Sequence, residues 1–176
     1  MIQMYDFEVF KCDWLVVIAD LVEQKVTKIH NDKEKLSKYF YAHETDVWAG
    51  YNVVHYDQYI MKAILLDMDP KKVNDFIIQE HEDGWQYSTL FRQINIINFD
   101  IMMKMDGGLK SLEGFMGENI KETSVPFDID RPLTAAEVEE TFKYCEWDVE
   151  KSIDVFVERK PEFDAAVGLV KIFGLP

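Results

Sequence analysis

The sequence contains little cysteine, no long apolar run and few positive charges. Its two cysteines, Cys12 and Cys145, lie far apart and in no ligand-like spacing, so we expect reduced thiols and a cytoplasmic protein. No stretch of about 18 apolar residues is present, which excludes a membrane-spanning helix and predicts a soluble globular protein. The first residues carry acidic side chains where a signal peptide needs a basic start and an apolar run.

Positive charge is scarce: 19 Lys and Arg stand against 33 Asp and Glu, a formal net charge of -14. Taken alone, this charge argues against nucleic-acid binding, because phosphate affinity usually comes from Lys and Arg patches. A bound divalent cation reverses the sign locally, so the total charge does not exclude a phosphate site. The 176 residues, 48% of them hydrophobic, suffice for one domain with a substantial core.

Apolar periodicity and turn signals predict an α/β protein. Its expected elements are strands over 1–10, 13–20 and 24–30, a helix capped by Asn31 or Asp32 and running to Ala42, a strand over 47–51, helices over 56–67 and 70–80, a strand over 94–101, a short helix over 109–117, and a long helix that begins with a capping box at Thr134, breaks at Pro161 and resumes over 162–173. Three antiparallel strands followed by crossover units predict a mixed five-stranded sheet with helices on its faces. We expect the first strand near its middle and a ligand site at the strand ends.

Two carboxylates interrupt the first strand, in the segment YDFEVF. Side chains alternate along a strand, so Asp6 and Glu8 point to the same side. Burying an unpartnered carboxylate costs several kcal/mol, and a second one adds repulsion. The acidic pairs at 67–69 and 128–130 have the same spacing but lie at a helix end and in a loop, where water solvates them. Only the first pair therefore needs a counter-charge.

Two further segments carry chemistry-bearing side chains. In NVVHYD, Asn52 and Asp57 flank a strand-to-helix turn, and by themselves they indicate ordinary helix capping. In YCEWD, Tyr144 and Asp148 are four residues apart on the last long helix and project from one side of it. By themselves they indicate a surface pair at the edge of the core.

Together the three segments resemble the three exonuclease motifs of the DEDD superfamily of 3'-5' exonucleases, which have a ribonuclease-H-like fold. The shared patterns are Asp-x-Glu in the first strand, Asn-x-x-x-Tyr-Asp after a later strand and Tyr-x-x-x-Asp on a late helix. The Tyr of the third motif is typical of the DEDDy subgroup; the His subgroup has a His where Lys143 stands. More narrowly, YDFEVFKCDWLVV, GYNVVHYDQYI and LKSLEGFMG…VPFDIDRPLT…YCEWDV resemble the N-terminal exonuclease domains of phage DNA polymerase-like proteins, over most of residues 4–150.

The resemblance implies a metal site and a mechanism. Its ligands would be the four carboxylates that match the motifs: Asp6, Glu8, Asp57 and Asp148. They would hold two divalent cations, Mg²⁺ or Mn²⁺, which suit an all-oxygen site and can act together on a phosphodiester. Tyr144 would orient the attacking water, and the products would be a 5'-nucleoside monophosphate and a shortened 3' end.

Weaker candidates surround these motifs. As substrate-binding residues we expect Phe7, Asn52, His55 and Lys110, and His55 is also compatible with simple packing in its turn. Lys110 and Arg131 are candidate phosphate contacts, although a solvated surface charge is the stronger interpretation of each. Core packing is the stronger interpretation of Trp14, Trp48 and Trp85, with base stacking as the alternative. Asp100, at the end of the fifth strand, stays outside the metal set.

The resemblance predicts a single exonuclease domain over residues 1–176, as the N-terminal part of a longer polymerase-like protein of a phage or prophage. Its substrate would be a single-stranded or frayed DNA 3' end, in proofreading for an attached or partner polymerase. Three alternatives stay open: an RNA-trimming exonuclease of the same fold, an inactive nucleic-acid-binding or scaffold module, and a calcium-binding or acidic interaction protein. The last predicts that the Asp128-Ile-Asp130 loop holds the ion.

Overall fold

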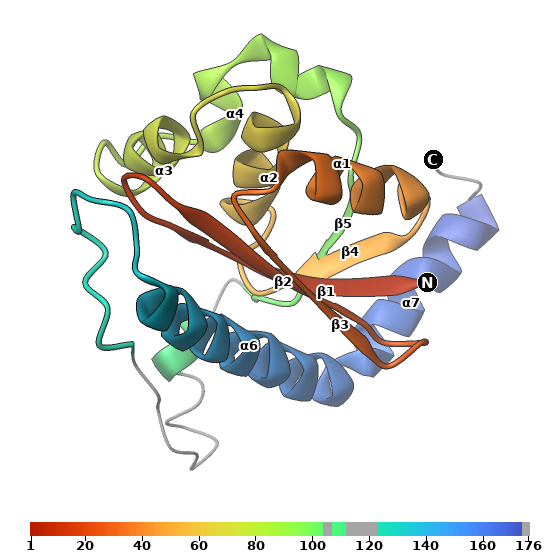
Figure 1. The fold of residues 1–176 in the computed structure, drawn as a ribbon. Helices are drawn as coiled ribbons and strands as arrows, with labels where there is room; N and C mark the ends of the chain where they lie inside the picture. Colours follow the sequence, from red (N-terminus) through yellow and green to blue (C-terminus); the bar gives the residue numbers. More distant parts are fainter. Residues whose placement is uncertain (104–106, 112–122, 174–176) are drawn as a thin grey trace.

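The computed structural model describes residues 1–103, 107–111 and 123–173 and is built around a five-stranded mixed sheet in the order β3-β2-β1-β4-β5 (Figure 1). The strands are β1 (Ile2–Val9), β2 (Trp14–Asp20), β3 (Lys25–His30), β4 (Val47–Gly50) and β5 (Ile97–Asp100). β1 is antiparallel to β2 and parallel to β4, and β4 is parallel to β5. The predicted α/β class and the central position of β1 are confirmed.

Helices cover both faces of the sheet (Figure 1). They are α1 (Lys33–Ala42), α2 (Asp57–Leu65), α3 (Pro70–Ile78), α4 (Gly84–Tyr87), the 3-10 helix η1 (Thr89–Gln93), α6 (Ala135–Glu158) and α7 (Lys160–Phe173). α1 to α4 lie on one side of the sheet, and α6 and α7 lie on the other.

The alternation of side chains along β1 separates two hydrophobic cores. Tyr5, Phe7 and Val9 pack with the helices α1 to α3, whereas Met4 packs with α6. Because neighbouring side chains of a strand point to opposite faces, Asp6 and Glu8 must share the face of Met4. β1 therefore presents its acidic residues toward α6.

Local sequence signals set several helix boundaries. The side chain of Asp32 accepts a hydrogen bond from the Lys35 N–H at 2.9 Å and so caps α1. Thr134 and Glu137 form the expected capping box of α6. Pro161 is the second residue of α7, where its missing N–H breaks no helical hydrogen bond, so the predicted interruption is confirmed.

Other boundaries differ from prediction. β5 covers only residues 97–100; Ile94 and Ile96, which extended the predicted strand, are buried by packing into the core of α1 to α3 instead of by strand pairing. α4 and η1 were not expected, since residues 84–93 show no clear period. Residues 109–111 of the short helix expected over 109–117 are helical, and its other residues lie outside the described residues.

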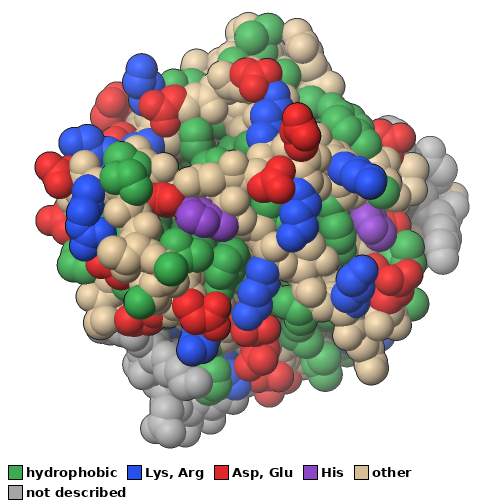
Figure 2. Space-filling view, viewed as in Figure 1, with side chains coloured by type: hydrophobic (Ala, Val, Ile, Leu, Met, Phe, Trp, Pro, Cys, Tyr) green, Lys and Arg blue, Asp and Glu red, His purple; other side chains and the backbone are tan. Residues whose placement is uncertain are grey.

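Acidic and basic side chains are interspersed on the face shown in Figure 2, with small apolar areas between them. No continuous basic surface for a phosphate backbone is visible on this face. In the described part of the chain, none of the helices combines the length and the apolar character that crossing a membrane requires.

Candidate metal centre

Asp6 and Glu8 lie on the face of β1 that α6 covers. Met4 of the same face packs with Cys145 and Val149 of α6. Asp6 is half-buried, and Glu8 is 8% exposed. The prediction that a largely buried strand holds two carboxylates on one side is confirmed.

α6 brings the third motif to this pair. The Cys145 thiol donates to the backbone oxygen and to Oδ2 of Asp6, at 3.3 Å in each case. Tyr144 precedes Cys145, and Asp148 follows one turn later, buried and hydrogen bonded to Tyr144. Because α6 contacts both β1 and β2, its packing fixes the register between the first and third motifs.

Asp57 contacts β1 along the part of the strand that does not pair with β4. β4 pairs with β1 only from Ile2 to Met4, so the later part of β1 has no β4 neighbour. On this edge the Phe7 N–H donates to Oδ1 of Asp57 at 2.9 Å. Asp57 is the first residue of α2 and is 2% exposed. A contact across 50 residues thereby sets the second-motif carboxylate against the strand of Asp6 and Glu8.

The turn that delivers Asp57 is held by Gly50 and Asp100. A Cβ at Gly50 would lie 2.7 Å from the Tyr5 carbonyl oxygen, so only glycine lets β4 end this close to β1. Asn52 follows with φ 63°, a left-handed conformation that Asn tolerates. Asp100 accepts hydrogen bonds from the N–H groups of Asn52 and Val54, at 2.9 and 3.0 Å. Asp100 thus stabilises the turn.

We define the carboxylate cluster as Asp6, Glu8, Asp57 and Asp148. Burial raises the pKa of Asp6 well above its usual value, and the charges of Asp57, Glu8 and Asp148 raise it further. Burial followed by the charges of Asp148 and Asp57 does the same to the pKa of Glu8. Burial raises the pKa of Asp57 to about 7 although the Phe7 N–H opposes the rise. Full ionisation of the cluster therefore requires added positive charge.

Lys110 supplies part of that charge. Its Nζ forms an ion pair with Asp148 and lies 4.7 Å from the centroid of the Tyr144 ring. The interpretation of Lys110 as an ordinary solvated charge is therefore wrong. Among the described residues this ammonium group acts on Asp148 and Glu8, and a divalent cation would add the positive charge that ionisation of Asp6 and Asp57 requires.

Other residues predicted to bind substrate take different positions. His55 is exposed and, with Asn52 and Asp100, lines a pocket of about 210 Å³ whose walls include none of the four carboxylates. Arg131 forms a two-pronged ion pair with Glu137, both contacts at 2.8 Å, which accounts for its charge within the protein. The structure therefore groups Phe7 and Lys110 with the carboxylate cluster and sets Asn52 and His55 beside it.

A cleft of about 470 Å³ adjoins the cluster. Glu8 and the Phe7 segment form one wall, α3 forms another through Ile78, and Phe127 forms a third. Ile78 and Phe127 are both exposed apolar residues. Sequence reasoning did not select them, because an isolated apolar side chain in a loop or at a helix end carries no period or motif.

The donor set determines which ion fits. Carboxylate oxygens suit hard cations such as Mg²⁺ and Mn²⁺. The Cys145 Sγ also lies within 4.8 Å of carboxylate oxygens of Asp6 and Glu8. Burial and the two carboxylates raise the pKa of this thiol, which keeps it protonated and makes it a hydrogen-bond donor instead of a ligand. The acidic groups near one another could thus bind a metal ion through oxygen.

A second acidic group lies near the start of β1, and we call it the Gln3 network: Gln3, Asp20, His43 and Asp46. The Gln3 amide nitrogen donates to Oδ2 of Asp20 at 2.7 Å and to Oδ2 of Asp46 at 3.0 Å. The Tyr39 hydroxyl donates to the Gln3 oxygen at 2.8 Å. The amide occupies the position that a metal ion would take, so this group is a hydrogen-bond network. Sequence reasoning missed it, because its members come from three separate segments: β1, β2 and the connection between α1 and β4.

Comparisons with known proteins gave no match: neither a protein-family model, nor a curated protein, nor a solved structure is significantly similar to this chain.

Proposed function

We propose that the protein is a metal-dependent 3'-5' exonuclease that hydrolyses phosphodiester bonds at DNA 3' ends. The observation that carries the proposal is that Asp57 and Asp148, from two distant segments, come close enough to Asp6 and Glu8 to act on their ionisation in a largely buried group. The five-stranded mixed sheet with helices on both faces is compatible with the ribonuclease-H-like fold that the sequence resemblance implies.

The cluster fits two divalent cations, Mg²⁺ or Mn²⁺, by the chemistry of its donors. When bound, such cations supply charge stabilisation to the attacking and leaving oxygens of a phosphodiester. The chain contributes the arrangement of the ligands: β1 fixes Asp6 and Glu8, the Phe7 N–H fixes Asp57, and α6 fixes Asp148. The raised pKa values of Asp6 and Glu8 support the proposal, because a bound cation would favour the ionised form of both carboxylates.

Tyr144 has a positioning role in this proposal. Burial and the nearby charge of Asp148 raise the pKa of its phenol, which therefore stays protonated at neutral pH. A protonated phenol can orient a water molecule by hydrogen bonding but cannot remove its proton. This supports the prediction that Tyr144 orients the attacking water and is not a general base.

The cleft beside Glu8 is where we place the 3' end. Its exposed apolar side chains, Ile78 and Phe127, can contact a base while the scissile phosphate lies at the carboxylate cluster. An acidic chain binds such an end weakly by itself. A polymerase, attached or separate, could deliver the frayed 3' end and so compensate for this weak binding. The need for such delivery favours a role in proofreading.

Of the alternatives, calcium binding at the Asp128-Ile-Asp130 loop has the least support. Asp128 and Asp130 are exposed, and among the described residues neither belongs to a group of converging acidic or metal-binding side chains. RNA trimming shares the phosphate chemistry, so DNA and RNA must be tested side by side.

The test incubates the protein with end-labelled single-stranded DNA or RNA and Mg²⁺ or Mn²⁺, beside the variants Asp6→Ala and Tyr144→Phe. Glu34→Ala is a control that removes an exposed carboxylate of α1, outside both the cluster and the cleft. We expect stepwise 3' shortening by the wild type and by Glu34→Ala, a loss of about a thousandfold in Asp6→Ala, and an intermediate loss in Tyr144→Phe. Absence of shortening by the wild type, or full activity of Asp6→Ala, would contradict the proposal.

A further inference from the structure

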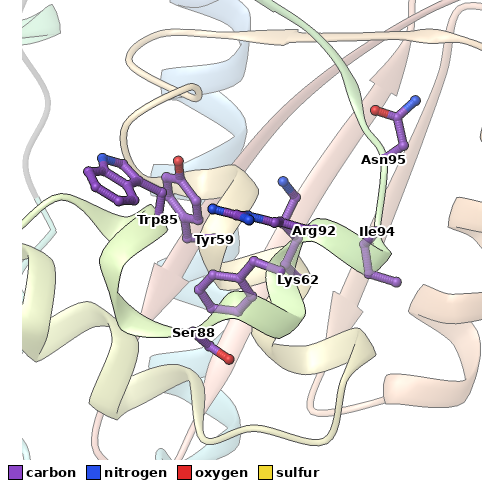
Figure 3. A pocket seen from close by; sticks show the side chains of 8 residues that line it. Tyr59, Lys62, Trp85, Ser88, Arg92, Ile94 and Asn95 are labelled. Atoms are coloured by element: carbon purple, nitrogen blue, oxygen red, sulfur yellow. The ribbon is translucent and has the colours of Figure 1, made fainter.

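A pocket of about 360 Å³ lies between α2, α4 and η1, apart from the four carboxylates (Figure 3). Tyr59 and Lys62 of α2 form one wall, Trp85 of α4 forms another, and Phe91 and Arg92 of η1 close it. The exonuclease motifs do not include any of these residues. In a chain with 33 acidic residues, a pocket built from aromatic and basic side chains needs its own explanation.

Trp85 is the first unusual feature of the pocket. Its side chain is 60% exposed, whereas Trp14 and Trp48 are buried, so the expectation of core packing is wrong for Trp85. The position of the ring is nevertheless fixed. The preceding Gly84 lies so close to α2 that a Cβ would stand 2.3 Å from the Tyr59 ring, and the indole N–H donates to Oδ2 of Asp83 at 3.2 Å. α4 thus holds a large aromatic face open to solvent.

The two cations are the second feature. The Lys62 Nζ donates to the amide oxygen of Gln58 at 3.1 Å and lies 5.5 Å from the centroid of the Tyr59 ring. Arg92 is exposed and extends toward Tyr59 and Trp85 in Figure 3. Within the described ranges no carboxylate lies at ion-pair distance from Lys62 or Arg92, whereas Lys28, Lys71 and Arg131 each have one.

The local charge of the pocket is therefore positive. Burial lowers the pKa of Lys62, because the charged ammonium group loses hydration there. A bound anion would offset this loss. Asp83 is the acidic group at the pocket edge, and its carboxylate already accepts the Trp85 indole N–H. Among the described residues that line the pocket, two are basic and none is acidic, so the lining is short of negative charge.

We propose that this pocket binds a nucleotide, with the base against Trp85 and the phosphate between Lys62 and Arg92. A base stacked on an exposed aromatic ring and a phosphate held by Arg and Lys are the two contacts that the walls offer. An acidic peptide would satisfy the cations but would leave the indole face without a planar partner. The nucleotide is either free or one unit of a single strand, and the proposal does not depend on cleavage at the carboxylate cluster.

The test measures binding in chelator, where the proposed cleavage cannot occur. Fluorescence anisotropy of a labelled single-stranded oligothymidylate follows binding, and thymidine 5'-monophosphate, inorganic phosphate and a short polyglutamate peptide are the competitors. The variants are Arg92→Gln and Trp85→Ala, both at exposed positions. Lys38→Gln and Tyr41→Ala, an exposed cation and an exposed aromatic ring of α1, are the matched controls.

We expect each pocket variant to weaken oligonucleotide binding by about tenfold, and the controls to match the wild type. If thymidine monophosphate displaces the oligonucleotide better than inorganic phosphate does, the pocket binds single nucleotides. If the oligonucleotide binds but thymidine monophosphate does not displace it better than phosphate does, the pocket binds a nucleotide only as part of a strand. Equal affinity of wild type and both pocket variants overturns the proposal, as does an absence of oligonucleotide and nucleotide binding or stronger competition by polyglutamate. Circular dichroism verifies that the variants fold.

Discussion

A buried acidic group lies near each end of β1, and the two groups differ in how the charge of their carboxylates is balanced. In the Gln3 network, burial opposes the charge of Asp20, but the N–H groups of Glu23 and Val22 and the Gln3 amide outweigh it, and the pKa of Asp20 is lowered. The pKa of Asp46 is lowered in the same way by the terminal amine, His43 and Gln3. In the carboxylate cluster, burial and mutual repulsion raise the pKa of Asp6 and Glu8.

The difference lies in the donors and not in the acids. Around Asp20 and Asp46 the protein places enough N–H groups to balance the carboxylates, so that end of the strand is complete without a ligand. Around Asp6 and Glu8 the described donors are fewer: a thiol to Asp6 and the ammonium group that pairs with neighbouring Asp148. A cluster of buried carboxylates is therefore a candidate metal site when the protein supplies too few hydrogen-bond donors to balance its charge.

The largest expected effect comes from removing the central donor of the Gln3 network. Gln3→Leu leaves Asp20 and Asp46 buried without their shared amide, and we expect a loss of about 3 to 5 kcal/mol in the free energy of unfolding. Urea denaturation measures it. Gln93→Leu, at an exposed position, is the control and should change stability by less than about 0.5 kcal/mol. A small effect of Gln3→Leu would show that the network does not need its amide.

The two groups should respond to pH in opposite directions. For Asp57 the folded pKa of about 7 exceeds the usual 3.8, so the folded state binds more protons between these values and stability falls as pH rises through that window. In chelator we expect the wild type to gain about 2 to 3 kcal/mol on going from about pH 8 to about pH 5. The lowered pKa values of Asp20 and Asp46 predict a loss only at lower pH, below their usual values.

Asp57→Asn sharpens this test. Its amide oxygen can still accept the Phe7 N–H, while its charge is gone. We expect thermal melts of this variant in chelator to show a smaller gain between about pH 8 and about pH 5 than the wild type. An unchanged pH dependence would mean that Asp57 does not titrate in this range.

Neutralising one carboxylate of the cluster should stabilise the metal-free protein. Asp6→Asn removes a charge that burial and three neighbouring carboxylates oppose, and we expect a gain of about 1 to 2 kcal/mol in chelator. The same variant should lose most of the increase in melting temperature that Mg²⁺ or Mn²⁺ gives the wild type. A variant that is no more stable than the wild type in chelator would argue against a shared, repulsive cluster.

The smallest expected effect concerns Lys110. Lys110→Gln removes the ammonium group that pairs with Asp148, so the cluster should bind Mn²⁺ a few fold more tightly, by calorimetry, because less positive charge opposes the ion. If Lys110 also contacts the substrate phosphate, as the sequence predicted, cleavage should weaken while cation affinity rises. Weaker cation binding in the variant would contradict a competition between Lys110 and the metal.

Much of the fold and part of the site follow from the sequence for simple reasons. Alternation along β1 is enough to place Asp6 and Glu8 on one face, and the spacing of Tyr144 and Asp148 is enough to place them one helical turn apart. The capping box of α6, the Asp32 cap of α1 and the prolines mark helix starts, because these signals involve only a few neighbouring residues. Such features depend on local geometry, which a pattern of residue types records.

The features that escaped prediction depend on contacts between distant segments. The hydrogen bond from Phe7 to Asp57 exists because β4 ends after three paired residues, and no local signal reports how far two strands pair. The ion pair of Lys110 with Asp148 and the exposure of Trp85 likewise depend on how distant elements pack. The assignment to the exonuclease superfamily remains a prediction.

The short pairing of β4 with β1 also has a kinetic consequence. The Phe7 amide proton is held by a single side chain, Asp57, where most amides of a central strand are held by a neighbouring backbone. The rate at which this amide exchanges with deuterium should therefore depend on the Asp57 carboxylate. Exchange should be slow when the carboxylate is ionised and fixed in place, and fast when it is protonated or displaced. One backbone amide can thus serve as an isotopic reporter of the occupancy of the whole site.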